Sequence, residues 1–272
     1  MKKGLVSAAL FASSVFVASS AMASPVIYNL ALNNISAFDN VITGVGSTVA
    51  TAQVVGGQSV YNYIDKDGNN ATVTVTRPIS GVAAVPSSTI YGFGGPAPLS
   101  GGRWDIGPNS AAIGGSPAIP GFNNAGLKFT FSSPVNAFGF EIGDWATCCM
   151  SGSRPQNVQD AYGVPANGSG LWIAFDGGAA TLPANALSAN DNPGYVAYGQ
   201  YTNFIGAIDS SGFFSSVTFF GDGFGEVLYA GGTLRFASVP RGSVGTVPEP
   251  ASLALLGLGL VGLVAARRSK SG

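Results

Sequence analysis

The sequence contains no histidine and few charged side chains, which make up 9% of its 272 residues. Histidine is the commonest general base and a frequent metal ligand in proteins. Its absence excludes serine–histidine and cysteine–histidine nucleophiles and histidine-ligated zinc sites. The sequence therefore predicts no enzyme activity that depends on these arrangements.

The central part of the chain, between its N-terminal and C-terminal segments, is mildly acidic. Residues 24–246 contain seven basic and twelve acidic side chains, which gives a net charge of −5. Nucleic-acid binding requires a basic surface. The sequence therefore predicts no nucleic-acid partner.

Glycine, proline and aromatic residues are plentiful, with 40 Gly, 16 Pro, 17 Phe and 9 Tyr. Short apolar or alternating segments are separated by turn residues, and no segment has a convincing amphipathic helical pattern. The sequence therefore predicts an all-β protein, an antiparallel β-sandwich body over residues 24–240 in which residues 77–126 are rich in loops. The predicted strands are residues 26–32, 59–64, 71–76, 127–131, 135–142, 171–175, 203–208, 213–220 and 233–237.

The first 23 residues have the layout of a secretory signal peptide. Lys2 and Lys3 precede an apolar stretch that ends in Ala21-Met22-Ala23, an A-x-A cleavage site. An uncleaved transmembrane anchor is the alternative, which the small residues at the end of the stretch disfavour. We expect cleavage after Ala23 and export of the chain.

The C-terminal end has three parts that follow one another closely. A linker at 241–250 contains Pro248-Glu249-Pro250, residues 251–266 are uncharged and mostly apolar, and a basic tail at 267–272 follows. Sixteen helical residues rise about 24 Å, and about 30 Å of hydrocarbon must be crossed. A buried core helix is the alternative, but the position at the end of the chain favours a short transmembrane helix with a cytoplasmic tail.

The order of Pro248, Glu249 and Pro250, the apolar run, and then Arg267 and Arg268 resembles the PEP-CTERM sorting signal of Gram-negative bacteria. The resemblance implies processing by an exosortase, a membrane transpeptidase, after an intermediate anchored in the inner membrane. It also implies a final place at the cell surface or in the extracellular matrix, with exopolysaccharide as a candidate partner. Gram-positive sortase signals have a Leu-Pro-x-Thr-Gly core, which this tail lacks.

The body also resembles, more loosely, the jelly-roll bodies of exported PEP-CTERM proteins. The resemblance lies in the segments Phe131–Phe140, Leu171–Gly178, Phe204–Gly206 and Phe214–Phe219. It implies an architecture and not an activity, because jelly rolls carry lectin-like, structural and catalytic functions alike.

Two acidic, glycine-containing loops are weak candidates for a calcium site. Asp65, Asp67 and Asn69 have the spacing that begins a calcium loop, but the remaining ligands of an EF-hand are missing. Asp222 and Glu226 lie in a second such loop. Ordinary turns are the favoured interpretation of both, since Asp, Asn and Gly are common turn residues. The sequence therefore predicts no cofactor, with calcium as the alternative.

Glu141 and Asp144, beside Trp145, could form the acid/base pair of a glycosidase. Twelve acidic residues offer many such pairs, so catalysis by this pair is disfavoured. Trp104 and Trp172, together with Trp145, suggest a lectin, but buried aromatic residues are the more common case.

Cys148 and Cys149 are the only cysteines and are adjacent in the chain. Export makes their oxidation plausible, and a vicinal disulfide would rigidify the surrounding loop. Neighbouring Cα atoms lie about 3.8 Å apart, below the usual range for a bridge. An intermolecular bond and free buried thiols stay open as alternatives.

These observations lead to one expected function and two alternatives. We expect an exported surface or matrix protein, sorted by an exosortase, whose β-sandwich is structural or contacts glycan. A carbohydrate-active enzyme is the first alternative, and it requires a cleft with two carboxylates. A lectin of the cell envelope is the second.

Overall fold

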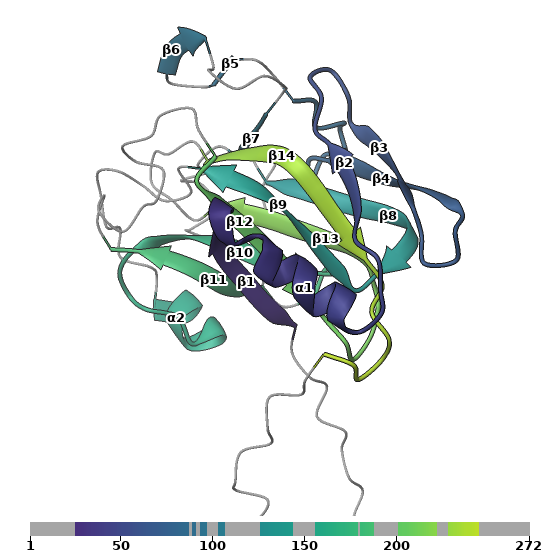
Figure 1. Ribbon diagram of the computed structural model, residues 1–272. Coiled ribbons are helices and arrows are strands. Elements are labelled where there is room, and N and C mark those ends of the chain that lie inside the picture. The colour runs from purple at the N-terminus through teal and green to yellow at the C-terminus, as the bar shows by residue number, and fades with distance from the viewer. Residues whose placement is uncertain are drawn as a thin grey trace, which may run out of the picture.

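The computed structural model shows a mostly β protein built from two antiparallel sheets (Figure 1). The prediction of an all-β protein with antiparallel sheets is confirmed. The structure describes residues 25–86, 89–90, 93–96, 103–106, 126–143, 156–178, 180–187, 201–221 and 228–244.

The first sheet contains six strands in the order β1-β12-β9-β14-β2, with β7 also paired to β14. Their bounds are β1 Val26–Ala31, β2 Ala50–Gln53, β7 Trp104–Ile106, β9 Ala137–Gly143, β12 Asn203–Ile208 and β14 Leu228–Ala237.

The second sheet also has six strands, in the order β11-β10-β13-β8-β4-β3. Their bounds are β3 Val60–Ile64, β4 Asn70–Thr76, β8 Leu127–Val135, β10 Ser169–Phe175, β11 Thr181–Ala186 and β13 Phe214–Gly221. A separate two-stranded ribbon joins β5 Thr89–Ile90 to β6 Phe93–Pro96.

Eight strands follow a jelly-roll order. Along the chain, β2, β9, β12 and β14 lie in the first sheet as β2-β14-β9-β12, and β8, β10, β11 and β13 lie in the second as β8-β13-β10-β11. This interleaving of sequential strands between two sheets is the double Greek key of a jelly roll. The β3–β4 hairpin and β1 extend the two sheets at their edges.

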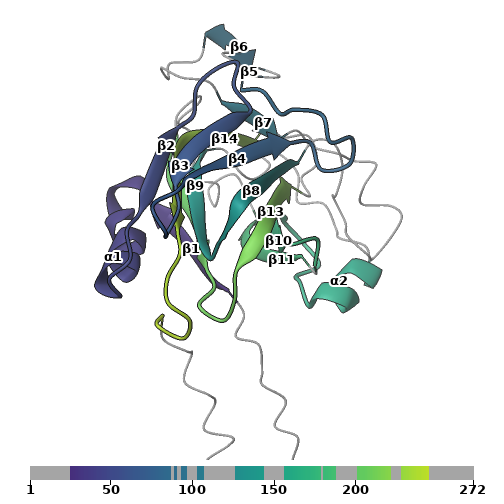
Figure 2. The same ribbon diagram turned by 90° about the vertical axis from the view of Figure 1, so that its right-hand side faces the viewer.

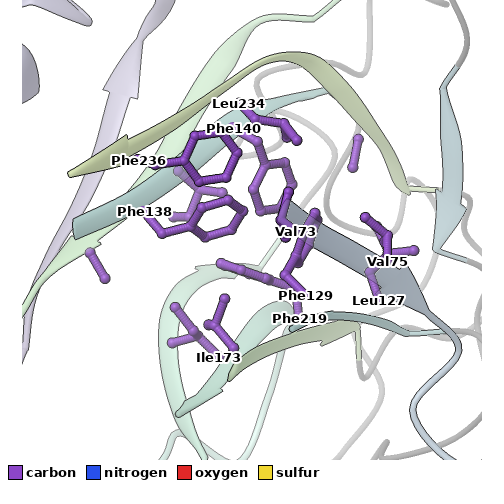
Figure 3. Close-up of a cluster of buried hydrophobic side chains, with 14 of the residues drawn as sticks. Val73, Val75, Leu127, Phe129, Phe138, Phe140, Ile173, Phe219, Leu234 and Phe236 are labelled. Carbon is purple, nitrogen blue, oxygen red and sulfur yellow. The ribbon is translucent and has the colours of Figure 1, made fainter. Parts of the chain in front are cut away.

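The two sheets share one core of aromatic and aliphatic side chains (Figure 3). Phe129 of β8 lies 4.8 Å from Phe138 and 5.3 Å from Phe140 of β9, between ring centroids. Val73 and Val75 of β4 point into the same core and are fully buried. The predicted inward orientation of these valines is confirmed, and the alternating threonines of β4 lie on the outer face.

A helix covers the outer face of the first sheet. Helix α1, Ser36–Gly44, follows a short 3-10 turn at Leu32–Asn34 and buries Phe38 and Ile42 against the sheet (Figure 2). The prediction that the body has no amphipathic helix is wrong here. Phe38 and Ile42 are four residues apart, the spacing of one helical face, but polar neighbours obscure the pattern.

Gly139 and Gly206 leave space for this covering layer, and both lie in segments that resemble other exported bodies. The ring of Phe204 in β12 lies across Gly139 of β9 and Gly206 of β12. A Cβ atom at Gly139 would fall 2.2 Å from Phe204 Cζ, and one at Gly206 would fall 2.7 Å from Phe204 Cε1. The Phe-Gly-Phe and Phe-Ile-Gly patterns therefore serve packing between Phe204 and the adjacent strands.

Within the described ranges, α2 covers the outer face of the second sheet over β10 and β13. Helix α2, Gln156–Tyr162, places Tyr162 5.4 Å from Trp172, which stacks on Phe220 of β13 at 6.0 Å. Figure 2 shows α1 and α2 on opposite sides of the molecule. Helix α2 and strands β2 and β11 were not predicted either, because they are short and rich in polar or small residues.

The predicted strands 127–131 and 135–142 leave Ser132, Ser133 and Pro134 between them as a connection, and the structure corrects this prediction. Strand β8 continues to Val135 and the chain reverses at Asn136 instead. Proline lacks the N–H that a strand ladder needs, and the pairing between β8 and β13 shifts register at this place.

Candidate functional site

A cleft of about 680 Å³ opens where β2, β3 and the end of β14 meet. Its lining combines hydroxyl, amide and charged groups with an apolar floor. The lining residues are Gly46, Ser47, Thr48, Ala50, Thr51, Asn62, Tyr63, Ile64, Asp65, Lys66, Gly68, Asn70, Val135, Phe236, Ala237 and Ser238. This volume lies in the range of small-molecule sites in proteins.

The floor of the cleft is rigid. Tyr63 stacks on Phe236 with ring centroids 4.7 Å apart and planes at 16°. Its hydroxyl donates to the backbone carbonyl of Ser133 at 2.5 Å. Burial raises the pKa of Tyr63 to about 12, so the phenol stays neutral at physiological pH. Tyr63 and Phe236 are 5% and 1% exposed, so the two rings support the cleft from beneath and present little surface to a ligand.

The loop of Asp65, Asp67 and Asn69, for which an ordinary turn was favoured over a calcium site, forms one rim of the cleft as a hairpin turn between β3 and β4. Asp65 accepts hydrogen bonds from the backbone N–H groups of Asn69 at 2.8 Å and Asp67 at 2.9 Å, and from the hydroxyl of Ser133 at 3.1 Å. These bonds, led by that from Asn69, lower the pKa of Asp65. The ammonium of Lys66 pairs with the Asp67 carboxylate at 2.6 Å.

Both carboxylates of this loop are thus engaged within the turn itself. Among the described residues, no group of three or more acidic, cysteine or histidine side chains gathers in a way that could hold a metal ion. The other calcium candidates, Asp222 and Glu226, lie outside the described residues.

Glu141, the disfavoured candidate for an acid/base pair with Asp144, lies on the outer face of the first sheet and does not line the cleft. Its carboxylate accepts from the backbone N–H of Thr233 at 3.3 Å and lies 3.8 Å from the guanidinium of Arg235. Arg235 also lies 3.3 Å from Asp39 of α1. The three charged side chains therefore tie α1 to the sheet. Asp144 and Trp145 lie outside the described residues.

The two described tryptophans are core residues. Trp104 and Trp172 are both fully buried, and Trp104 donates its indole N–H to the carbonyl of Ala84 at 2.8 Å. Neither can present its ring face to a glycan at the surface. The preference for core packing over a lectin role is confirmed for these two.

The end of the folded body is fixed by a buried amide. Asn136, 1% exposed, donates to the carbonyl of Val239 at 2.9 Å and accepts from the N–H of Val239 at 2.7 Å. Further on, the N–H of Gly242 donates to the carbonyl of Ser210, whose hydroxyl donates to the carbonyl of Val244. Packing thus continues to Val244, four residues before Pro248.

The cleft itself was not predicted from the sequence. Ser47, Thr51 and Asn62 come from separate segments, and single polar residues on short strands carry no pattern of their own. Their grouping depends on the pairing of β2 with β14 and of β3 with β4.

The remaining predicted sites lie outside the described residues. They are the signal peptide with Ala21 and Ala23, the cysteines Cys148 and Cys149, and the C-terminal residues Pro248, Glu249, Pro250, Arg267 and Arg268. Within the described ranges, neither helix has the length and apolar character needed to cross a membrane.

The fold defines a jelly-roll body that ends next to a short C-terminal segment. That segment, residues 246–269, matches the family described as the PEP-CTERM protein-sorting motif. The chain therefore carries an exosortase sorting signal, which implies export toward the cell surface and processing by an exosortase. No curated protein and no solved structure matches the chain.

Proposed function

We propose that this protein is a surface or extracellular-matrix component that an exosortase releases from the inner membrane, and that its body contacts exopolysaccharide through the cleft. The sorting motif at residues 246–269 carries the first part of this proposal. The predicted signal peptide supports export of the chain. The apolar run at residues 251–266 supports an intermediate that is anchored in the inner membrane.

The composition of the cleft supports a glycan ligand. The lining includes Ser47 and Thr51, which carry hydroxyls, and Asn62, which carries an amide, above the buried rings of Tyr63 and Phe236. Thr51 and Asn62 are exposed on neighbouring strands. Hydroxyls and amides both donate and accept hydrogen bonds, as the hydroxyl groups of a sugar require.

The charges around the cleft support a binding role over a catalytic one. Asp65 is the one carboxylate among the described lining residues, and it is committed to its own turn. Glycoside hydrolysis generally requires two carboxylates on opposite sides of the bond that breaks. We therefore propose a non-catalytic module whose ligand is a neutral, hydroxyl-rich sugar unit.

The test measures binding of protein purified from cells to the exopolysaccharide purified from the same culture. Asn62→Ala with Thr51→Ala should weaken binding about tenfold, which corresponds to the loss of hydrogen bonds together worth about 1.4 kcal/mol. Thr130→Ala, which removes an exposed hydroxyl on the outer face of β8, is the matched control and should leave binding unchanged. Absence of binding by the unaltered protein, or equal losses in both variants, would contradict a glycan role for the cleft.

A further inference from the structure

Both ends of the described chain meet at one turn of the sandwich. Val26, the first residue of β1, pairs with Ile208 at the end of β12. Gly242 donates its N–H to the carbonyl of Ser210 in the turn that follows β12. Figures 1 and 2 show the start of β1 and the end of the described chain at the same lower end of the molecule. We call this end, with residues 209–213 and 240–244, the exit end.

The chain between this end and the two apolar segments is short. An extended chain covers at most about 3.6 Å per residue. Seven residues lead from Val244 to Ala251, which limits their separation to about 25 Å. Three residues lead from Val26 back to Ala23, a limit of about 11 Å.

The opposite end of the sandwich lies nearly as far away as the longer tether can reach. Strand β8 runs from Lys128, which pairs with Thr76 of β4, to Val135 beside the exit end. Seven residues at about 3.3 Å each separate Lys128 from Val135 by about 23 Å. If the body were inverted, the chain from Val244 to Ala251 would have to run fully extended along the side of the body. That path alone would use nearly its whole length.

The surface of the exit end suits a membrane. Phe213 is 49% exposed in the turn after β12. Arg241 is exposed beside it and donates from Nε to the carbonyl of Ser211 at 2.8 Å. Aromatic residues favour the bilayer interface, and basic side chains are attracted to anionic headgroups.

We propose that the exit end faces the lipid bilayer before processing, so that the folded body stands on the membrane with the turn of residues 77–82 pointing away from it. Because both ends of the body lie at the exit end, β1 and β14 can form while the apolar segments on either side of the body remain in the bilayer. This inference rests on the proposed membrane-anchored intermediate and adds its orientation.

The test places a fluorescent amino acid at position 213 or at position 82 of the unprocessed full chain. Val82 is the matched control, since it is an exposed apolar residue, 61% accessible, in the turn after β4. Each protein is reconstituted in vesicles of phosphatidylethanolamine and phosphatidylglycerol that contain a lipid with a nitroxide on its headgroup. We expect several-fold stronger quenching at position 213 than at position 82.

A longer tether supplies the second control. Insertion of about twenty Gly and Ser residues after Val244, a coil of roughly 25 Å root-mean-square span, should reduce the difference between the two positions. Equal quenching without the insertion, or stronger quenching at position 82, would overturn the proposed orientation while leaving the sorting route intact. Failure of the full chain to float with the vesicles would overturn both.

Discussion

The two outer faces of the sandwich differ in how they are covered. The face of the first sheet beneath α1 is sealed: Phe38 and Ile42 pack on Phe204, Ile208 and their neighbours. The face of the second sheet over β4 and β8, here called the open face, carries exposed or half-buried polar side chains, and neither helix of the described residues covers it. These residues of the open face are Thr72, Thr74 and Thr76 of β4 and Lys128, Thr130 and Ser132 of β8.

The comparison separates residues that pack to maintain the fold from polar residues at the surface. Gly139 of β9 and Gly206 of β12 lie on the sealed face, where they accommodate the ring of Phe204. The motifs that resemble other exported bodies therefore mark packing, and a shared motif of this kind predicts architecture without predicting a ligand.

The largest expected effect comes from removing the central ring of the sealed face. Phe204→Ala should lower the free energy of unfolding by about 3–5 kcal/mol, because it leaves a cavity among buried side chains. Urea unfolding measures this as a shift in midpoint at constant slope. Thr130→Ala on the open face should change it by less than about 0.5 kcal/mol. Similar losses for the two variants would remove the distinction between the faces.

Adding a methyl group beneath that ring should also destabilise the protein. Gly139→Ala would place its Cβ 2.2 Å from Phe204 Cζ and 2.8 Å from the carbonyl oxygen of Ile205. We expect a loss of about 1–3 kcal/mol by overpacking. Gly212→Ala, which meets nothing within 4 Å, is the matched control. A neutral Gly139→Ala would mean that the packing of Phe204 is looser than described.

The ion pairs of Arg235, which join α1 to the first sheet, should contribute less to the free energy of unfolding. Arg235→Met removes the contacts to Asp39 and Glu141 and leaves two carboxylates without their cation. We expect a loss of about 1 kcal/mol, since the side chains are partly exposed. The difference from the unaltered protein should narrow in high salt. A loss independent of salt would assign the effect to packing of the Arg235 side chain.

The last effect is absent at neutral pH and should appear only at alkaline pH. Burial raises the pKa of Tyr61 and of Tyr63 from 10.0 to about 12, so the folded state retains these protons after the unfolded state has lost them. Stability should be constant below about pH 10 and fall between about pH 10 and 12. Tyr63→Phe should make this fall shallower in urea unfolding at a series of pH values. An unchanged fall would assign the alkaline loss to other groups.

Strands with alternating apolar residues could be predicted from the sequence. Val60–Ile64 and Asn70–Thr76 agree with the predicted segments to within one residue, because each buries alternate side chains against the core. Helix α1 could have been found from Phe38 and Ile42, but its polar residues hid the spacing. The cleft could not have been predicted, because it joins Thr51, Asn62 and Ser238 across sheet pairings that local patterns do not specify.

The most direct test of the central claim is the fate of the chain when Pro248, Glu249 and Pro250 are all changed to Ala. These residues lie in the matched sorting motif and beyond Val244, where the body's described packing ends, so the body should fold and be exported as before. Cell fractionation should find the variant in the inner membrane while the unaltered protein reaches the surface or the medium. Normal surface release of the variant would contradict sorting through this motif.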